Sequence, residues 1–158
     1  MEKEFKKLIK ESKKSLEKSE EKIEDLSEDF TEEVSEFWVD LKKRFSKIND
    51  KLKDAYHDFE EKAELKGHLG IIEARDKLEQ VRESAQEFTQ KISSNAQAEL
   101  DIATLKAQLA KMEGEDLWEE KQKEFSLLYK DSKTEAEKLA KKTGREINEI
   151  FLKLTEMM

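Results

Sequence analysis

The chain has 158 residues, of which 44% are charged and 35% hydrophobic, a net charge of −8 at pH 7, and neither proline nor cysteine. Ordinary globular domains contain about 25% charged residues, so this composition favours long helices with narrow apolar stripes. The acidic balance excludes the electrostatic footprint of a nucleic-acid-binding protein, and the lack of cysteine excludes disulfides and thiolate chemistry.

Residues 1–25 are predicted to form an amphipathic helix with a sparse apolar stripe among lysines and glutamates, many of them at i,i+4 spacing. The stripe consists of Phe5, Leu8, Ile9, Leu16 and Ile23. The start of the sequence has no apolar signal-peptide core, and no run approaches the ~20 apolar residues of a membrane span. We therefore expect a soluble, cytoplasmic protein.

From Leu26 to Ala63 the apolar stripe is denser, and its members are spaced by threes and fours, as in a packed helix. Around Trp38 the run Phe37-Trp38-Val39 is apolar on more than one face of the helix. A second such widening lies beside Tyr129. These places predict either contact with a further helix or a surface for a partner.

The segment SEDFTEEVSEFWVDLKKRF, residues 27–45, begins with Ser-Glu-acidic-aromatic and continues into a Trp-acidic-Leu-Lys block. It resembles a segment of small bacterial coiled-coil proteins described as apolipoprotein-like, and the resemblance covers about a third of the chain. The resemblance implies an elongated helical protein that contacts lipid or protein and has no active site.

An internal repeat relates residues 63–79 to residues 103–119, about 40 positions later. The shared residues are Ala63, Leu65, Lys66, Leu69, Glu73, Asp76 and Glu79 in the first copy, and Ala103, Leu105, Lys106, Leu109, Glu113, Asp116 and Glu119 in the second. Each glycine of one copy aligns with alanine in the other, so we expect these glycines to lie inside helices. An antiparallel register then places small residues at a close helix contact, pairing Gly70 with Gly114 and Ala74 with Ala110.

Ser93, Ser94 and Asn95 predict a turn, and Ser94 followed by Gln97 fits a capping box. We therefore predict an all-α fold: a single elongated domain built as a long antiparallel, coiled-coil-like hairpin with arms 26–92 and 95–158, about 95 Å long. In this arrangement residues 1–25 form an overhang. The alternative is a three-helix bundle broken between Gly67 and Gly70 and at Gly114.

The sequence offers little for catalysis or metal binding. Asp54, His57 and Glu61 share a helix face and could hold a metal, but the Glu-x-x-His pairs of di-iron bundles are missing. The other histidine, His68, lies about three turns further along the same predicted helix. Carboxylates fall outside the apolar stripe, where nothing shifts their pKa. We expect no enzyme, and no catalytic, cofactor or metal site.

Two functions are consistent with these features. The first is a non-enzymatic scaffold or interaction protein that self-associates through helices, since the overhang needs a second copy, or another protein, to cover it. Its expected interaction residues are Phe5, Leu8, Ile9, Leu16, Ile23, Trp38, Trp118 and Tyr129. The alternative is a peripheral membrane or lipid-binding protein, anchored by Phe5, Leu8 and Ile9 with the lysines around them.

Overall fold

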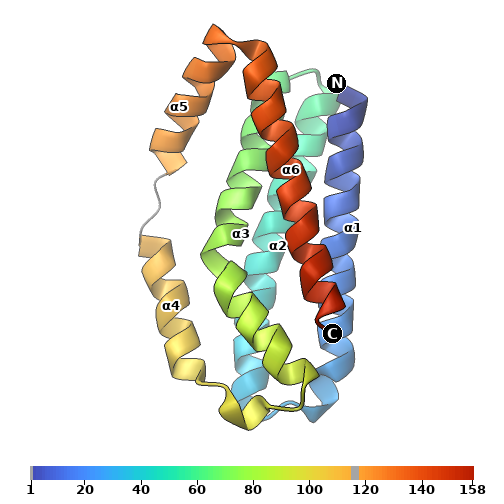
Figure 1. Cartoon of the computed structure of the whole chain (residues 1–158), viewed down its shortest axis with the longest axis vertical. Coiled ribbons are helices and arrows are strands. Elements are labelled where there is room, and N and C mark those ends of the chain that lie inside the picture. The colour runs from blue at the N-terminus through green and yellow to red at the C-terminus, as the bar shows by residue number, and fades with distance from the viewer. Residues whose placement is uncertain (1, 115–117) are drawn as a thin grey trace.

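The computed structural model describes residues 2–114 and 118–158, which form six α-helices and two short 3₁₀ turns (Figure 1). The helices are α1 (Glu2–Leu26), α2 (Glu32–Glu60), α3 (Glu64–Ser93), α4 (Ile102–Gly114), α5 (Trp118–Asp131) and α6 (Lys133–Glu156). The 3₁₀ turns are η1 (Ser27–Asp29) and η2 (Gln97–Glu99). The prediction of an all-α fold is confirmed for the described residues.

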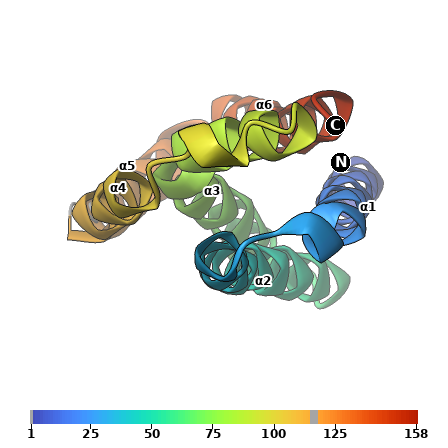
Figure 2. The same cartoon turned by 90° about the horizontal axis from the view of Figure 1, so that it is seen from below.

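Helices α1, α2, α3 and α6 form a bundle in which α1, α3 and α6 run in one direction and α2 runs in the opposite one, and α4 and α5 return along the outer side of α3 (Figures 1 and 2). Helix α1 packs against α2 and α6, and α3 also packs against both, so α2 and α6 occupy opposite corners. Helix α4 contacts α3 and α2, whereas α5 contacts α3 and α6. The pair α4–α5 therefore crosses α3 obliquely and leaves one side of α5 at the edge of the molecule.

One continuous apolar core joins these helices, and it is rich in phenylalanine. Each long helix presents residues spaced by threes and fours to it, which is the pattern of one helix face. The largest fully buried side chains include Phe5, Phe37, Phe45, Phe59, Phe88 and Phe151. Burying a side chain of this size stabilises the fold by about 1.5–3 kcal/mol.

The predicted arm 26–92 is wrong, because the chain reverses between α2 and α3. Lys62 has φ 60°, and the reversal is closed by hydrogen bonds from Ala63 N to Asp58 O (2.8 Å) and from Lys62 N to Phe59 O (3.1 Å). This is the Schellman pattern of a helix C-terminus, formed here with lysine where glycine is usual. The hairpin arm becomes two helices packed side by side, and α3, the longest helix with 30 residues, spans only ~45 Å.

The prediction that Gly67 and Gly70 lie inside a helix is confirmed, since both belong to α3 and neither has a positive φ. The predicted partner of Gly70 is wrong. A Cβ on Gly70 would lie 2.8 Å from Ala55 Cβ, so the close contact is between α3 and α2. Ala74 is buried, but its predicted partner Ala110 is exposed. The three-helix alternative is wrong about a break between Gly67 and Gly70. Gly114 is the last described residue of α4, and the predicted break after it lies outside the described residues.

The predicted overhang is also wrong, because residues 2–25 belong to α1, which packs against α2 and α6 in the bundle. Small and hydroxyl-bearing residues explain why so sparse a stripe is buried. The Ser12 Oγ donates to Gly144 O (3.3 Å) and the Ser19 Oγ donates to Phe151 O (3.0 Å). These bonds satisfy polar groups that burial would otherwise penalise.

The predicted second arm, 95–158, is divided as well. The turn at Asn95 is confirmed by its φ of 59°, but the proposed N-cap is wrong, since the Ser94 Oγ donates back to Gln90 O (2.9 Å). Ser132 separates α5 from α6 and accepts a hydrogen bond from Glu135 N (3.3 Å), which makes it the N-cap of α6.

No helix in the described part of the chain has the length and apolar character to cross a bilayer.

Candidate functional site

Most of the predicted interaction residues belong to the core. Phe5, Ile9, Leu16, Ile23 and Trp38 are each at most 4% exposed, and Leu8, Trp118 and Tyr129 are half-buried. Trp38 stacks on Phe88 with a centroid distance of 6.3 Å, and its Nε1 donates to Glu24 Oε1 (3.0 Å). The five buried side chains therefore belong to the core and are not available to a partner.

His68 lies inside an aromatic shell at the end of the bundle where four helices meet. Its ring centroid is 4.5 Å from that of Phe5 on α1 and 5.2 Å from that of Phe59 on α2. On α5, Tyr129 and Phe125 approach to 5.8 and 6.2 Å. Burial lowers the pKa of His68 to about 4, against the opposing charge of Glu64. The imidazole is therefore neutral at pH 7 and packs as a further ring of the cluster.

The other histidine lies on the surface. His57 Nε2 is 3.6 Å from Glu61 Oε1, and both side chains are exposed. Across the described residues, no group of three or more His, Cys, Asp or Glu side chains is arranged to hold a metal ion. The helix face considered for a metal therefore supplies only this pair.

The inner side of α5 is fixed to the bundle by polar contacts around Glu64. The Tyr129 hydroxyl donates to Glu64 Oε2 (3.3 Å), and Lys133 Nζ lies 2.8 Å from the same oxygen. The Lys133 ammonium holds the pKa of the Glu64 carboxyl below its usual range. Lys121 forms an ion pair with Asp76 on α3. Since these contacts orient α5, its opposite side faces solvent.

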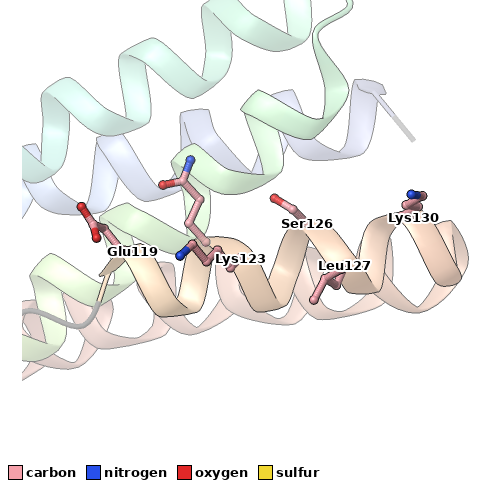
Figure 3. Close-up of a pocket in the computed structure, with 6 residues that line it drawn as sticks. Glu119, Lys123, Ser126, Leu127 and Lys130 are labelled. Atoms are coloured by element: carbon pink, nitrogen blue, oxygen red, sulfur yellow. The ribbon is translucent and has the colours of Figure 1, made fainter.

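The outer side of α5 carries the most exposed large apolar side chain in the described part of the chain, Leu127, at 63%. It lies in a broad hollow of about 840 Å³ whose lining residues, as far as they are described, all belong to α5 (Figure 3). The lining residues are Glu119, Gln122, Lys123, Ser126, Leu127 and Lys130. Exposed apolar groups framed by polar ones are typical of interaction surfaces.

Four charged residues surround Leu127 on this surface, at the positions that are neighbours on a helix. We call them, together with the leucine, the Leu127 face: Lys123, Glu124, Leu127, Lys130 and Asp131. All five side chains are exposed. None of the four charges makes an ion pair with another described residue, whereas Lys121 on the inner side does. The Leu127 face is therefore the best candidate for a functional site.

In the sequence, this site is indicated by the apolar stripe that widens beside Tyr129, but the predicted interaction residue is Tyr129 itself. In the structure Tyr129 turns inward to Glu64 and His68, and Leu127, two positions earlier, faces solvent. The direction in which each residue faces depends on how α5 rotates onto α3 and α6, which the local sequence does not fix.

Comparison of the chain with protein-family models, with curated proteins and with solved structures gives no match. The resemblance of residues 27–45 to apolipoprotein-like coiled-coil proteins therefore stays a prediction.

Proposed function

We propose that this protein is a non-enzymatic helical interaction protein that self-associates through the Leu127 face of α5. The observation that carries the proposal is the order of charges around an exposed leucine. Lys123 and Asp131 lie four positions before and after Leu127, and Glu124 and Lys130 lie three positions before and after it. On a helix, Lys123 and Lys130 lie along one flank of Leu127, whereas Glu124 and Asp131 lie along the other, so the face has a basic flank and an acidic flank.

A second copy related by a two-fold axis parallel to α5 makes use of this order. Its α5 runs parallel, so that Lys123 faces the partner's Glu124 and Lys130 faces the partner's Asp131. The two-fold axis repeats both contacts, giving four opposite-charge contacts around a pair of leucines. An antiparallel arrangement would instead bring each flank of α5 against the same flank of the partner and place like charges opposite each other, which is unfavourable. The charge order therefore favours one orientation.

The contact should be weak. The face occupies one helix of 14 residues, well short of the two surfaces that together bury about 1,600 Å² in a standard interface. Its charges are exposed, so salt screens their attraction over about 10 Å at 0.1 M ionic strength. We therefore expect a reversible dimer whose population rises with protein concentration and falls with salt. This contact replaces the predicted association through residues 1–25, because α1 is already packed in the bundle.

The alternative of a membrane anchor at residues 3–10 has less support. Phe5 and Ile9 are each 1% exposed, so the apolar half of the proposed anchor contacts the core. Inserting those side chains into lipid would require α1 to leave α2 and α6, which would break the hydrogen bonds of Ser12 and Ser19.

Sedimentation velocity over a concentration series at low salt tests the proposal. We expect a monomer–dimer equilibrium for the wild type. Lys130→Glu should weaken it at least tenfold, because each substituted carboxylate would face the partner's Asp131. Combining Lys130→Glu with Asp131→Lys should restore it, since the pairs are then reversed at unchanged net charge.

Leu152→Ser is the matched control, since Leu152 is also an exposed leucine, at 42%, but lies on α6. It should leave the equilibrium unchanged. A wild-type protein that stays monomeric throughout, or a double variant as weak as Lys130→Glu alone, would refute the proposed contact.

A further inference from the structure

A group of lysines around Tyr56 gathers positive charge on an otherwise acidic protein. A hollow of about 300 Å³ between α1 and α2 is lined by Lys3, Lys6, Lys7, Lys10 and Tyr56. The four lysines share one side of α1, since they are three and four positions apart. The chain as a whole carries a net charge of −8, so this concentration of ammonium groups is a local exception.

The Tyr56 ring draws two of these lysines inward. Lys6 Nζ lies 5.2 Å from the ring centroid and Lys10 Nζ lies 5.5 Å from it. Cations at this distance are attracted to the face of an aromatic ring. Because the ring is anchored in α2, it holds two like charges of α1 near each other over a common surface.

Few carboxylates neutralise the group. Glu2 lies 4.0 Å from Lys6 Nζ, at the limit of an ion pair. Glu4, the other acidic residue of the first turn, is 2.5 Å from Lys141 Nζ on α6 and so is engaged elsewhere. Lys3, Lys7 and Lys10 make no ion pair with any carboxylate in the described part of the chain. The amino end of α1 adds the positive end of a helix dipole to this region.

From this arrangement we infer that the Tyr56 hollow binds phosphate groups that carry more than one negative charge. Three of the four ammonium groups that line the hollow have no carboxylate partner in the described part of the chain, and lysine binds phosphate as a point charge. A compact polyphosphate in solution and the phosphate headgroups of an anionic membrane share this chemistry. Lipid contact at this site would be electrostatic, with α1 remaining in the bundle. The site lies on α1 and α2, and the inference does not depend on the Leu127 face.

Isothermal titration of the full chain with sodium tripolyphosphate, and co-sedimentation with phosphatidylcholine vesicles with and without phosphatidic acid, separate the two sources. Binding in either experiment should weaken as salt is added. The double variant Lys6→Gln, Lys10→Gln should reduce the binding affinity about 30-fold. This value follows if each lysine contributes as much to binding here as a lysine does near an anionic membrane surface.

The matched control is Lys14→Gln with Lys18→Gln, two exposed lysines on α1 with the same spacing that do not line the hollow. It changes the net charge equally and should leave affinity within about twofold of wild type, because neither ammonium group lines the hollow. Binding of tripolyphosphate alone identifies a soluble anion as the ligand, binding of phosphatidic acid vesicles alone identifies a membrane, and both outcomes support the site. Absence of both, or an equal loss in the two double variants, overturns the inference.

Discussion

Lowering the pH from 7 to 5 should destabilise this protein through His68. Its pKa is about 4 in the folded protein because the ring is buried, and about 6.5 in an unfolded chain. Between these two values the unfolded chain binds a proton that the folded protein does not, so stability falls as the pH falls through that window. Below pH 4 both states are protonated, and His68 adds no further change.

The magnitude follows from the two pKa values at 1.36 kcal/mol for each unit. From pH 7 to pH 5 the loss is about 2 kcal/mol, rising to about 3 kcal/mol near pH 4. A domain of this kind is stable by about 5–15 kcal/mol, so the change is measurable. With a urea m-value of about 2 kcal/mol per M, the unfolding midpoint should move down by about 1 M between pH 7 and pH 5.

Urea unfolding at pH 7, 6 and 5, followed by circular dichroism, measures this dependence. His68→Phe and His68→Leu remove the titrating group, so both should lose most of the slope with pH, whatever their stability at pH 7. His57→Gln, at the exposed histidine, is the control and should retain the wild-type slope. Hydrogen exchange should show the earliest acid loosening in α5, which contributes Phe125 and Tyr129 to the shell. A slope that persists in both His68 variants would refute the assignment.

Two further predictions concern backbone positions. Gly70→Ala should lower the free energy of unfolding by about 1–3 kcal/mol in urea, because its Cβ would overlap Ala55 on α2. In Gly144→Ala the new Cβ would lie 3.5 Å from Leu8 Cδ1, an ordinary contact, so this variant should gain about 1 kcal/mol through helix propensity. Equal effects of the two substitutions would refute the assigned contacts. Lys62→Gly should raise stability by about 1 kcal/mol by relieving its positive φ, and Lys53→Gly inside α2 should lower it by about as much; a loss in both would argue against the reversal at Lys62.

The two reversals between helices show what could be predicted from the sequence. Asn95 tolerates a positive φ and follows two serines, so the turn there was predicted correctly. Lys62 adopts the same conformation without any glycine or asparagine to signal it. Its conformation is imposed by the packing of α2 on α3, where Gly70 meets Ala55. A long-range contact therefore decides a local turn.

The repeat predicted the direction of one helix pair but not its register. Helix α4 does return along α3, and the Ser84 Oγ donates to Gln108 Oε1 (3.1 Å). The predicted register would have placed Gln108 opposite Asp76, two helical turns away, and Asp76 instead pairs with Lys121 on α5. The register was predicted by pairing small residues of the two repeat copies. It did not take into account that α3 also packs against α2 and that Gly70 lies at this contact. The Leu127 face was missed for a related reason, since the rotation of α5 is set by its contacts with α3 and α6.

The serine contacts between α1 and α6 have a consequence for synthesis of the chain. Ser12 is 132 positions before the carbonyl group it bonds, in Gly144. At about 5–20 residues per second, the ribosome takes on the order of ten seconds to produce the segment between them. During that interval the face of α1 that α6 will cover has no permanent neighbour within its own chain. The spaced hydroxyl groups make this face less prone to non-specific apolar association than a continuous apolar stripe. This matters for a helix that stays uncovered until α6 has been synthesised.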